Sequence, residues 1–117
     1  MAVENLFDPV EVRALPLTRG GDLRFYVEDA RTEPPSPFPA GTKGIVDIEV
    51  VGEEKKTFDA ELKSGKLYFV LNNEETDDVP ATSNKNKARW NLRISFADDP
   101  TTEIPVYEGP IHRGPYG

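Results

Sequence analysis

The sequence contains no cysteine, a single histidine and no long apolar run. Without cysteine there are no disulfide bonds, no thiolate catalysis, and no zinc or iron–sulfur centre held by thiolates. The single histidine, His112, offers no histidine pair for a metal ion and little choice for a Ser-His-Asp triad. It also lies in a stretch rich in glycine and proline, for which we expect a flexible tail. We therefore expect no catalytic residues, no metal site and no cofactor.

Positive charge is scarce as well, because 14 Lys and Arg stand against 21 Asp and Glu, for a formal net charge of −7. A nucleic-acid binder needs a basic face to displace counterions, so we expect no nucleic-acid partner. The sequence starts without a basic region followed by an apolar run, and no apolar segment is long enough to span a membrane. We therefore expect no membrane partner and a protein made in the cytoplasm.

Acidic residues gather in one polar stretch, residues 72–87. A calcium loop needs oxygen ligands at alternate positions and a glycine at the sharp turn, and the spacing here differs. The alternative, which we favour, is a solvated connection in which Val79 plugs one end of a sheet. The four carboxylates concerned are Glu74, Glu75, Asp77 and Asp78.

Alternation of apolar and polar residues is the strongest positive signal. Residues 88–96 place Trp90, Leu92, Ile94 and Phe96 on one face and polar side chains on the other, which is typical of a half-buried strand. Prolines at positions 16 and 105 favour edge strands. Together these segments predict an antiparallel sandwich or barrel with hardly any helix. The other expected strands cover residues 12–17, 23–28, 44–51, 57–62, 66–71 and 103–108, and the last of them either ends there or is extended by residues 111–113.

The 117 residues are expected to form one β-sandwich domain over residues 13–113, between an N-terminal arm, residues 1–12, and a C-terminal tail, residues 114–117. The arm either drapes over its own domain or docks on a neighbour. The proline-rich residues 29–43 predict a stiff crossover between sheets, and the alternative is a polyproline ligand for an aromatic groove. Phe38, inside this stretch, either covers the edge of the core or faces a partner.

Exposed tyrosine and arginine side chains on strands are the best candidates for contacts with other proteins, because they combine area with polar reach. The pattern places Arg24, Tyr26, Tyr68, Arg89 and Arg93 on outer faces, and both terminal segments add further candidates. The predicted contact residues are Leu6, Phe7, Val10, Tyr26, Phe38, Arg89, Ile111, His112, Arg113 and Tyr116.

Several landmarks recur together in a defined order: Gly21-Asp22 before a strand, the segment from Gly65 to Phe69, the strand from Trp90 to Phe96, and the final segment from Pro105 to Arg113. In this order the chain resembles the small immunoglobulin-like β-sandwich domains of tailed-phage virions. It is most similar to the LtfC-like group, which includes collar proteins that ring the tail tip and anchor side fibres. The resemblance covers roughly residues 15–113. It implies an all-β, antiparallel, immunoglobulin-like β-sandwich of about seven strands with extended N- and C-terminal arms.

The resemblance also implies a function, that of a non-enzymatic bacteriophage virion protein present in multiple copies. Such a protein is a tail-tip, collar or minor tail component that links or anchors other virion parts, and its partners are copies of itself and other virion proteins. Alternatives are a capsid decoration protein, a head–tail neck protein, or a carbohydrate-binding module. The last requires a solvent-facing aromatic platform, which Tyr26, Tyr68 and Tyr107 form only if they share a face.

Overall fold

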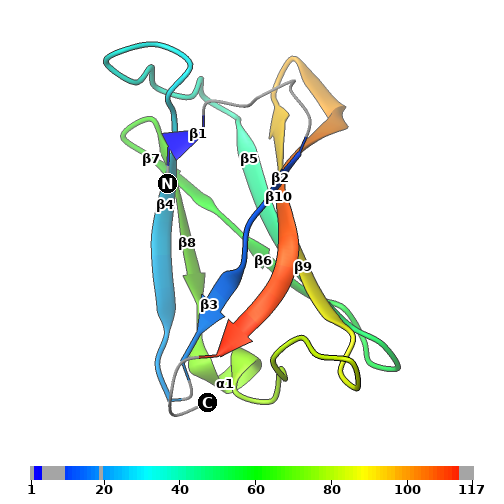
Figure 1. Ribbon diagram of the computed structural model, residues 1–117. Helices are drawn as coiled ribbons and strands as arrows, with labels where there is room; N and C mark the ends of the chain where they lie inside the picture. The colour runs from blue at the N-terminus through cyan, green and yellow to red at the C-terminus, as the bar shows by residue number, and fades with distance from the viewer. Residues whose placement is uncertain (1, 4–9, 19, 114–117) are drawn as a thin grey trace.

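The computed structural model describes residues 2–3, 10–18 and 20–113, and residues 2–3 by their backbone alone. The regular structure of this part of the chain is strand except for one short helix (Figure 1). The elements are β1 (Ala2–Val3), β2 (Glu11–Val12), β3 (Leu15–Leu17), β4 (Leu23–Asp29), β5 (Lys43–Val50), β6 (Lys56–Asp59), β7 (Glu61–Lys63), β8 (Lys66–Leu71), α1 (Asn73–Thr76), β9 (Ala88–Phe96) and β10 (Asp99–Arg113).

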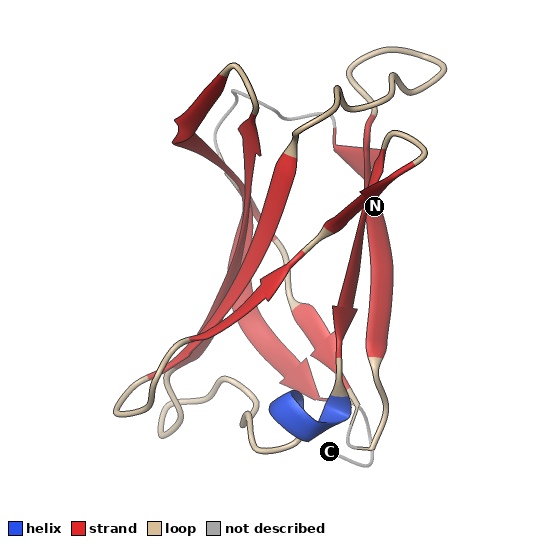
Figure 2. Ribbon diagram, turned by 180° about the vertical axis from the view of Figure 1, so that it is seen from behind, coloured by secondary structure: helices blue, strands red, loops and turns tan. Residues whose placement is uncertain are grey.

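The strands form two sheets that face each other (Figure 2). One sheet has four strands in the order β1-β4-β8-β7, and the other has six, in the order β2-β10-β9-β5-β6 with β3 also paired to β10. Successive hairpins lie in alternate sheets: β5–β6 and β9–β10 belong to the six-stranded sheet, and β7–β8 belongs to the four-stranded sheet. Immunoglobulin-like sandwiches distribute their strands in this way. The prediction of an all-β, immunoglobulin-like sandwich is confirmed. The structure has more strands than predicted because β1 is additional and two expected strands are each divided in two.

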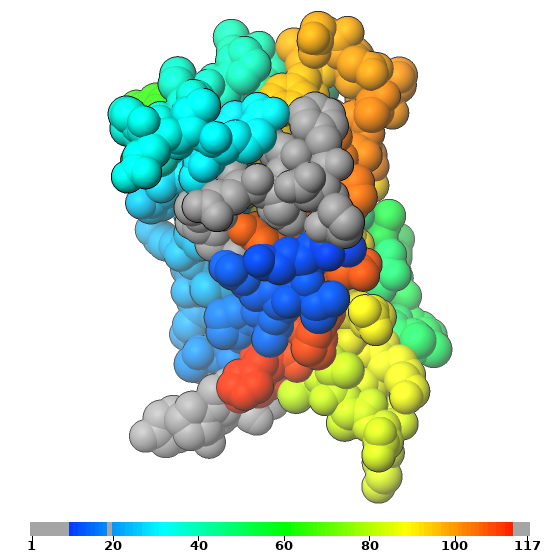
Figure 3. Space-filling model, turned by 45° about the horizontal axis from the view of Figure 1, so that its top comes forward, coloured from blue at the N-terminus to red at the C-terminus, as the bar shows by residue number. Residues whose placement is uncertain are grey.

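The first expected strand, residues 12–17, is divided at Arg13 into β2 and β3, and both pieces run parallel to β10. Figure 3 shows them, in dark blue, lying across the orange to red β10. The Arg13 N–H donates to the carbonyl oxygen of Glu108 at 2.9 Å, and the Arg13 carbonyl accepts a hydrogen bond of 2.7 Å from the Trp90 indole. This close crossing requires Gly109, since a Cβ there would lie 2.2 Å from the Arg13 carbonyl oxygen. The antiparallel prediction therefore fails for the N-terminal strands, which pair with sequence-distant strands in parallel.

The last strand is longer than predicted, because β10 extends from Asp99 to Arg113 rather than over residues 103–108. Its register against β9 shifts between Asp99 and Ile104 and again between Pro105 and Tyr107, so Pro105 sits where the ladder is already interrupted. Beyond the second shift, β2 and β3 pair with the other side of β10. His112 therefore lies in a paired strand, and the expectation of a flexible tail at this position was wrong.

The expected strand over residues 57–62 passes from one sheet to the other. β6 pairs with β5 in the six-stranded sheet, and after Ala60 the chain continues as β7, which pairs with β8 in the four-stranded sheet. The Ala60 N–H donates to the Gly44 carbonyl at 2.9 Å at the point of passage. A Cβ on Gly44 would lie 2.9 Å from the Phe69 ring, so glycine lets the two sheets approach closely there.

Aromatic side chains fill the space between the sheets. Trp90 is 2% exposed and stacks on Tyr107 with ring centroids 6.3 Å apart, and Phe25 stacks on Phe69 at 5.1 Å. Val79 is buried beneath the loop that follows α1, which confirms the prediction that it plugs one end of the sandwich. The alternation in residues 88–96 thus identified the core-facing side of β9 correctly.

The proline-rich segment after β4 connects the two sheets, as predicted for a stiff crossover. Phe38 is buried and its ring centroid lies 6.5 Å from that of Phe96, so it covers the edge of the core. Its N–H donates to the Gly65 carbonyl at 2.9 Å. At the start of the segment the Arg31 guanidinium hydrogen-bonds the Asp29 carboxylate, and these bonds hold the pKa of Asp29 below its ordinary value although burial opposes the shift.

Candidate functional site

The predicted contact residues do not meet at one place. Leu6, Phe7 and Tyr116 lie outside the described residues, and Val10 is half-buried just before β2. Tyr26 lies on the outer face of the four-stranded sheet, whereas Arg89 and His112 are exposed on strands of the six-stranded sheet. Contact of these residues with other proteins stays a prediction, and it would involve more than one face of the domain.

Three predicted contact residues are used inside the domain itself. Phe38 and Ile111 belong to the hydrophobic core, at 4% and 2% exposure. Arg113, at the end of β10, binds main-chain oxygens near α1: its Nε donates to the Val79 carbonyl at 2.9 Å and its Nη2 donates to the Thr76 carbonyl. Arg113 thus joins the last strand to the connection below the sandwich.

Replacing Arg113 with alanine is expected to lower the free energy of unfolding by about 1.5 kcal/mol, because partly buried carbonyls lose a charged donor. Urea unfolding followed by the fluorescence of the single tryptophan measures this loss. Arg113→Lys serves as the matched control and should recover less than half of it, since an ammonium cannot reach both carbonyls with a planar fork. Unchanged stability of Arg113→Ala would show that these hydrogen bonds contribute little to folding.

The outer face of the four-stranded sheet carries an aromatic patch formed by Tyr26, Tyr68 and Val70, which are 40%, 37% and 50% exposed. The two tyrosines are opposite each other in the ladder between β4 and β8, with ring centroids 5.7 Å apart and planes tilted by 43°. The Lys66 ammonium lies 4.6 Å from the centre of the Tyr26 ring. Such a surface of tyrosine, valine and lysine suits a protein contact better than it suits catalysis.

The outer face of the six-stranded sheet carries ion pairs between neighbouring strands, which the sequence analysis did not predict. Arg93 pairs with Asp47 on β5 and with Glu103 on β10. The Asp47 side chain is only 3% exposed, accepts a 2.8 Å hydrogen bond from the Thr57 hydroxyl and lies 3.8 Å from the Lys55 ammonium. The alternation in residues 44–51 indicated that Asp47 points outward, but nothing local in the sequence indicated that neighbouring strands cover it.

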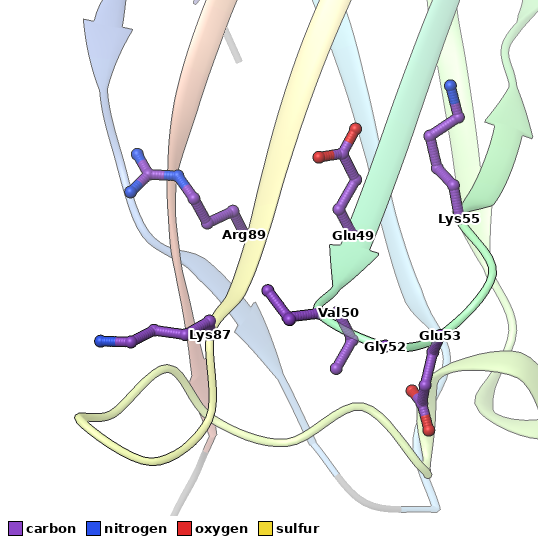
Figure 4. Close-up of a pocket in the computed structure, with 8 residues that line it drawn as sticks. Glu49, Val50, Gly52, Glu53, Lys55, Lys87 and Arg89 are labelled. Atoms are coloured by element: carbon purple, nitrogen blue, oxygen red, sulfur yellow. The ribbon is translucent and has the colours of Figure 1, made fainter.

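A hollow of about 350 Å³ lies at the end of this face, between the ends of β5 and β9. Figure 4 shows its charged side chains pointing apart: Arg89 and Lys87 project to one side, Glu49 and Lys55 point up, and Glu53 points down. A binding site for a small ligand needs polar groups that converge on one point. This hollow therefore lacks the converging polar groups of a pocket for a small molecule.

The acidic stretch has structural uses. Glu74 and Glu75 lie in the first turn of α1, the Asp77 carboxylate accepts from the Gly20 N–H at 2.9 Å, and Asp78 pairs with Lys56 at 3.3 Å. In the described part of the chain, no group of three or more His, Cys, Asp or Glu is placed to hold a metal ion. No helix among the described elements is long and apolar enough to cross a membrane.

Comparison with known protein families yields a match that spans most of the chain. The family described as an LtfC-like β-sandwich domain matches residues 9–114. No curated protein and no solved structure matches the sequence. The family match covers every strand of the sandwich from β2 to β10, and the two-sheet architecture agrees with its description. The chain belongs to the LtfC-like β-sandwich family.

Proposed function

We propose that this protein is a non-enzymatic structural component of a tailed-bacteriophage virion. It is present there in multiple copies, as a tail-tip, collar or minor tail protein that links or anchors other virion parts. Its partners are copies of itself and other virion proteins, and it binds neither nucleic acid nor membrane. It is made in the host cytoplasm and resides in the virion.

Membership of the LtfC-like β-sandwich family over residues 9–114 supports this proposal. The step from the family to a tail role rests on the resemblance to the β-sandwich domains of tailed-phage virions, which implies collar proteins that anchor fibres. The surfaces are compatible with such a role. The aromatic patch and the charged hollow lie on opposite sheets, so one copy presents two different faces to neighbours. Two different faces suit head-to-tail contacts, which close into rings when the rotation between copies permits it.

The mass of the purified protein in solution, with and without residues 1–9, tests this proposal. We expect a closed oligomer for the full chain and its dissociation into smaller species after truncation. The truncation stops before β2, so the pairing of β2 and β3 with β10 is kept. Tryptophan fluorescence of both forms provides the control, because Trp90 reports whether the core stays folded. A monomer for the full chain at every concentration would contradict self-assembly.

The carbohydrate-binding alternative is favoured only by the adjacency of Tyr26 and Tyr68. Tyr107 is 1% exposed and packs in the core, so it does not join them, and Trp90 is buried beside it. The platform of three tyrosines therefore does not form. A glycan screen with Tyr26→Ala as the control tests this role, because the variant removes one of the two exposed tyrosines on which a sugar would stack.

A further inference from the structure

The outer face of the four-stranded sheet has an ordered pattern of side chains. Along β4 the side chains that point outward are Arg24, Tyr26 and Glu28, in that order. On β8, Tyr68 lies opposite Tyr26, and Val70 lies opposite Arg24. On this face β4 is therefore basic at one end, aromatic in the middle and acidic at the other end.

A broad hollow of about 460 Å³ lies over the middle of this face. Its lining includes the three exposed residues of the aromatic patch, together with Arg24. Exposed aromatic and apolar side chains with charged neighbours are the usual composition of a contact between proteins. The order of the charges along β4 restricts which protein surface fits.

We propose that this face binds the same face of a second copy of the chain, with a two-fold axis between the copies. The axis lies across β4 and β8 at the level of Tyr26 and Tyr68, so each strand runs antiparallel to its own copy. The aromatic rings of the two copies then meet in the middle of the contact. Such a contact is isologous, which means that every interaction in it occurs twice.

The charges along β4 are complementary to those of the reversed strand. Arg24 of each copy faces Glu28 of the other, because both residues are two positions from Tyr26. Within the described chain their ion pairs are long, at 3.8 Å from Arg24 to Asp22 and 4.0 Å from Glu28 to Lys66. The Arg24 side chain is 74% exposed, so it can turn toward a second copy without leaving the core.

Lys66 and Val70 form the second row of the contact on β8. They are equally distant from Tyr68, so the apolar stem of Lys66 on one copy covers Val70 on the other. Sheets twist, so two such faces touch in the middle and separate toward their edges, which leaves Glu61 on β7 outside the contact. The loop after β4 stands beyond the upper end of that strand, and it would pass the lower end of the other copy (Figure 1).

The size of this face sets the strength of the contact. The face is about 20 Å long and about 14 Å wide, at about 3.3 Å per residue and about 4.8 Å between strands. Each copy therefore contributes about 300 Å², against about 800 Å² per partner in a stable complex. We expect a dissociation constant of about 0.1–1 mM for this contact alone. In an assembly held by further contacts the copies meet at a high effective concentration, which strengthens it.

Reversal of charge tests the contact in the full-length protein. Arg24→Glu makes both ends of β4 acidic and Glu28→Arg makes both ends basic, so each variant alone should associate about tenfold more weakly. Mixing the two variants should restore the association of the unmodified protein, because unlike copies attract each other at both ends. Diffusion measured by NMR at millimolar protein follows the association. If the mixture associates no better than either variant alone, the proposal is overturned.

Two controls separate this face from the rest of the surface. Lys85→Glu, in the exposed loop before β9, changes the net charge as Arg24→Glu does and should leave association unchanged. Val70→Lys places a cation opposite Lys66 of the other copy and should weaken association about tenfold. Val51→Lys is its matched control, because Val51 is 78% exposed at the turn after β5. Equal effects of the two lysine variants would overturn the proposal.

This contact rests on the proposed self-assembly and specifies one of its surfaces. It joins the copies in pairs, and head-to-tail contacts then use other surfaces. If the full-length chain is a monomer at every concentration, both self-assembly and this contact are rejected. An oligomer whose mass is unchanged by Arg24→Glu and by Val70→Lys keeps self-assembly and rejects the two-fold contact alone.

Discussion

Replacing Gly109 with alanine should lower the free energy of unfolding by about 3 kcal/mol, which is a large part of the total for a small domain. The added Cβ would lie 2.2 Å from the carbonyl oxygen and 2.9 Å from the carbonyl carbon of Arg13, and main-chain atoms cannot rotate away as a flexible side chain does. The N-terminal segment must therefore move off β10. That movement also removes the acceptor of the Trp90 indole.

Gly21→Ala is the matched control for this substitution. The nearest atom to a Cβ on Gly21 is 3.7 Å away, an ordinary contact, so alanine there should leave stability nearly unchanged. Urea unfolding of both variants, followed by far-UV circular dichroism and tryptophan fluorescence, makes the comparison. Equal midpoints for the two variants would show that the crossing of Arg13 over β10 contributes little to stability.

Replacing Asp47 with asparagine should cost about 2 kcal/mol, because the buried carboxylate is the inner partner of Arg93. The Asp47 side chain is 3% exposed, whereas that of Glu103, the other partner of the same guanidinium, is 41% exposed. Glu103→Gln is therefore the matched control, with an expected cost below about 1 kcal/mol. The expected losses of stability differ because Asp47 is buried and Glu103 is not, although each carboxylate pairs with the same arginine.

Thermal or urea unfolding at low and high salt distinguishes the two carboxylates further. At about 1 M salt the small effect of Glu103→Gln should shrink, since exposed pairs are screened, and the effect of Asp47→Asn should persist. A salt-sensitive Asp47 variant would contradict the burial that the structure gives this side chain. In that case the outer face of the six-stranded sheet would be as exposed to solvent at Asp47 as the aromatic patch is.

Local alternation predicted the elements whose pairing follows the chain. Residues 88–96 were recognised as a strand with Trp90 inward, because a period of two over nine residues leaves no other regular structure. Val79 is predicted as a plug of the core because it is a lone apolar residue in a polar segment. For Phe38 the local pattern leaves the core edge and a partner surface open, and the structure buries it at the core edge. The predictions for residues 88–96 and for Val79 depend on near neighbours in the sequence, which is why they hold.

The local pattern of apolar and polar residues does not predict which distant segments pair with each other. Gly109 lies in a C-terminal segment rich in glycine and proline, so from the sequence it resembles a turn residue. The structure shows that it is needed because the Arg13 main chain passes where a Cβ would lie. Parallel pairing of β2 and β3 with β10 joins residues that are more than ninety positions apart, for which periodicity contains no information. The same holds for Arg113, whose carbonyl partners lie on another part of the chain.

The parallel pairing of the terminal strands has a mechanical consequence. Since β2 and β3 run in the same direction as β10, the beginning of β2 and the end of β10 lie at opposite ends of their shared ladder. A pulling force between these two points loads the hydrogen bonds of the ladder together, in shear, whereas a hairpin such as β9–β10 opens one bond after another. The domain is therefore arranged to withstand tension along its length, a property that the proposed role as a link between virion parts would require.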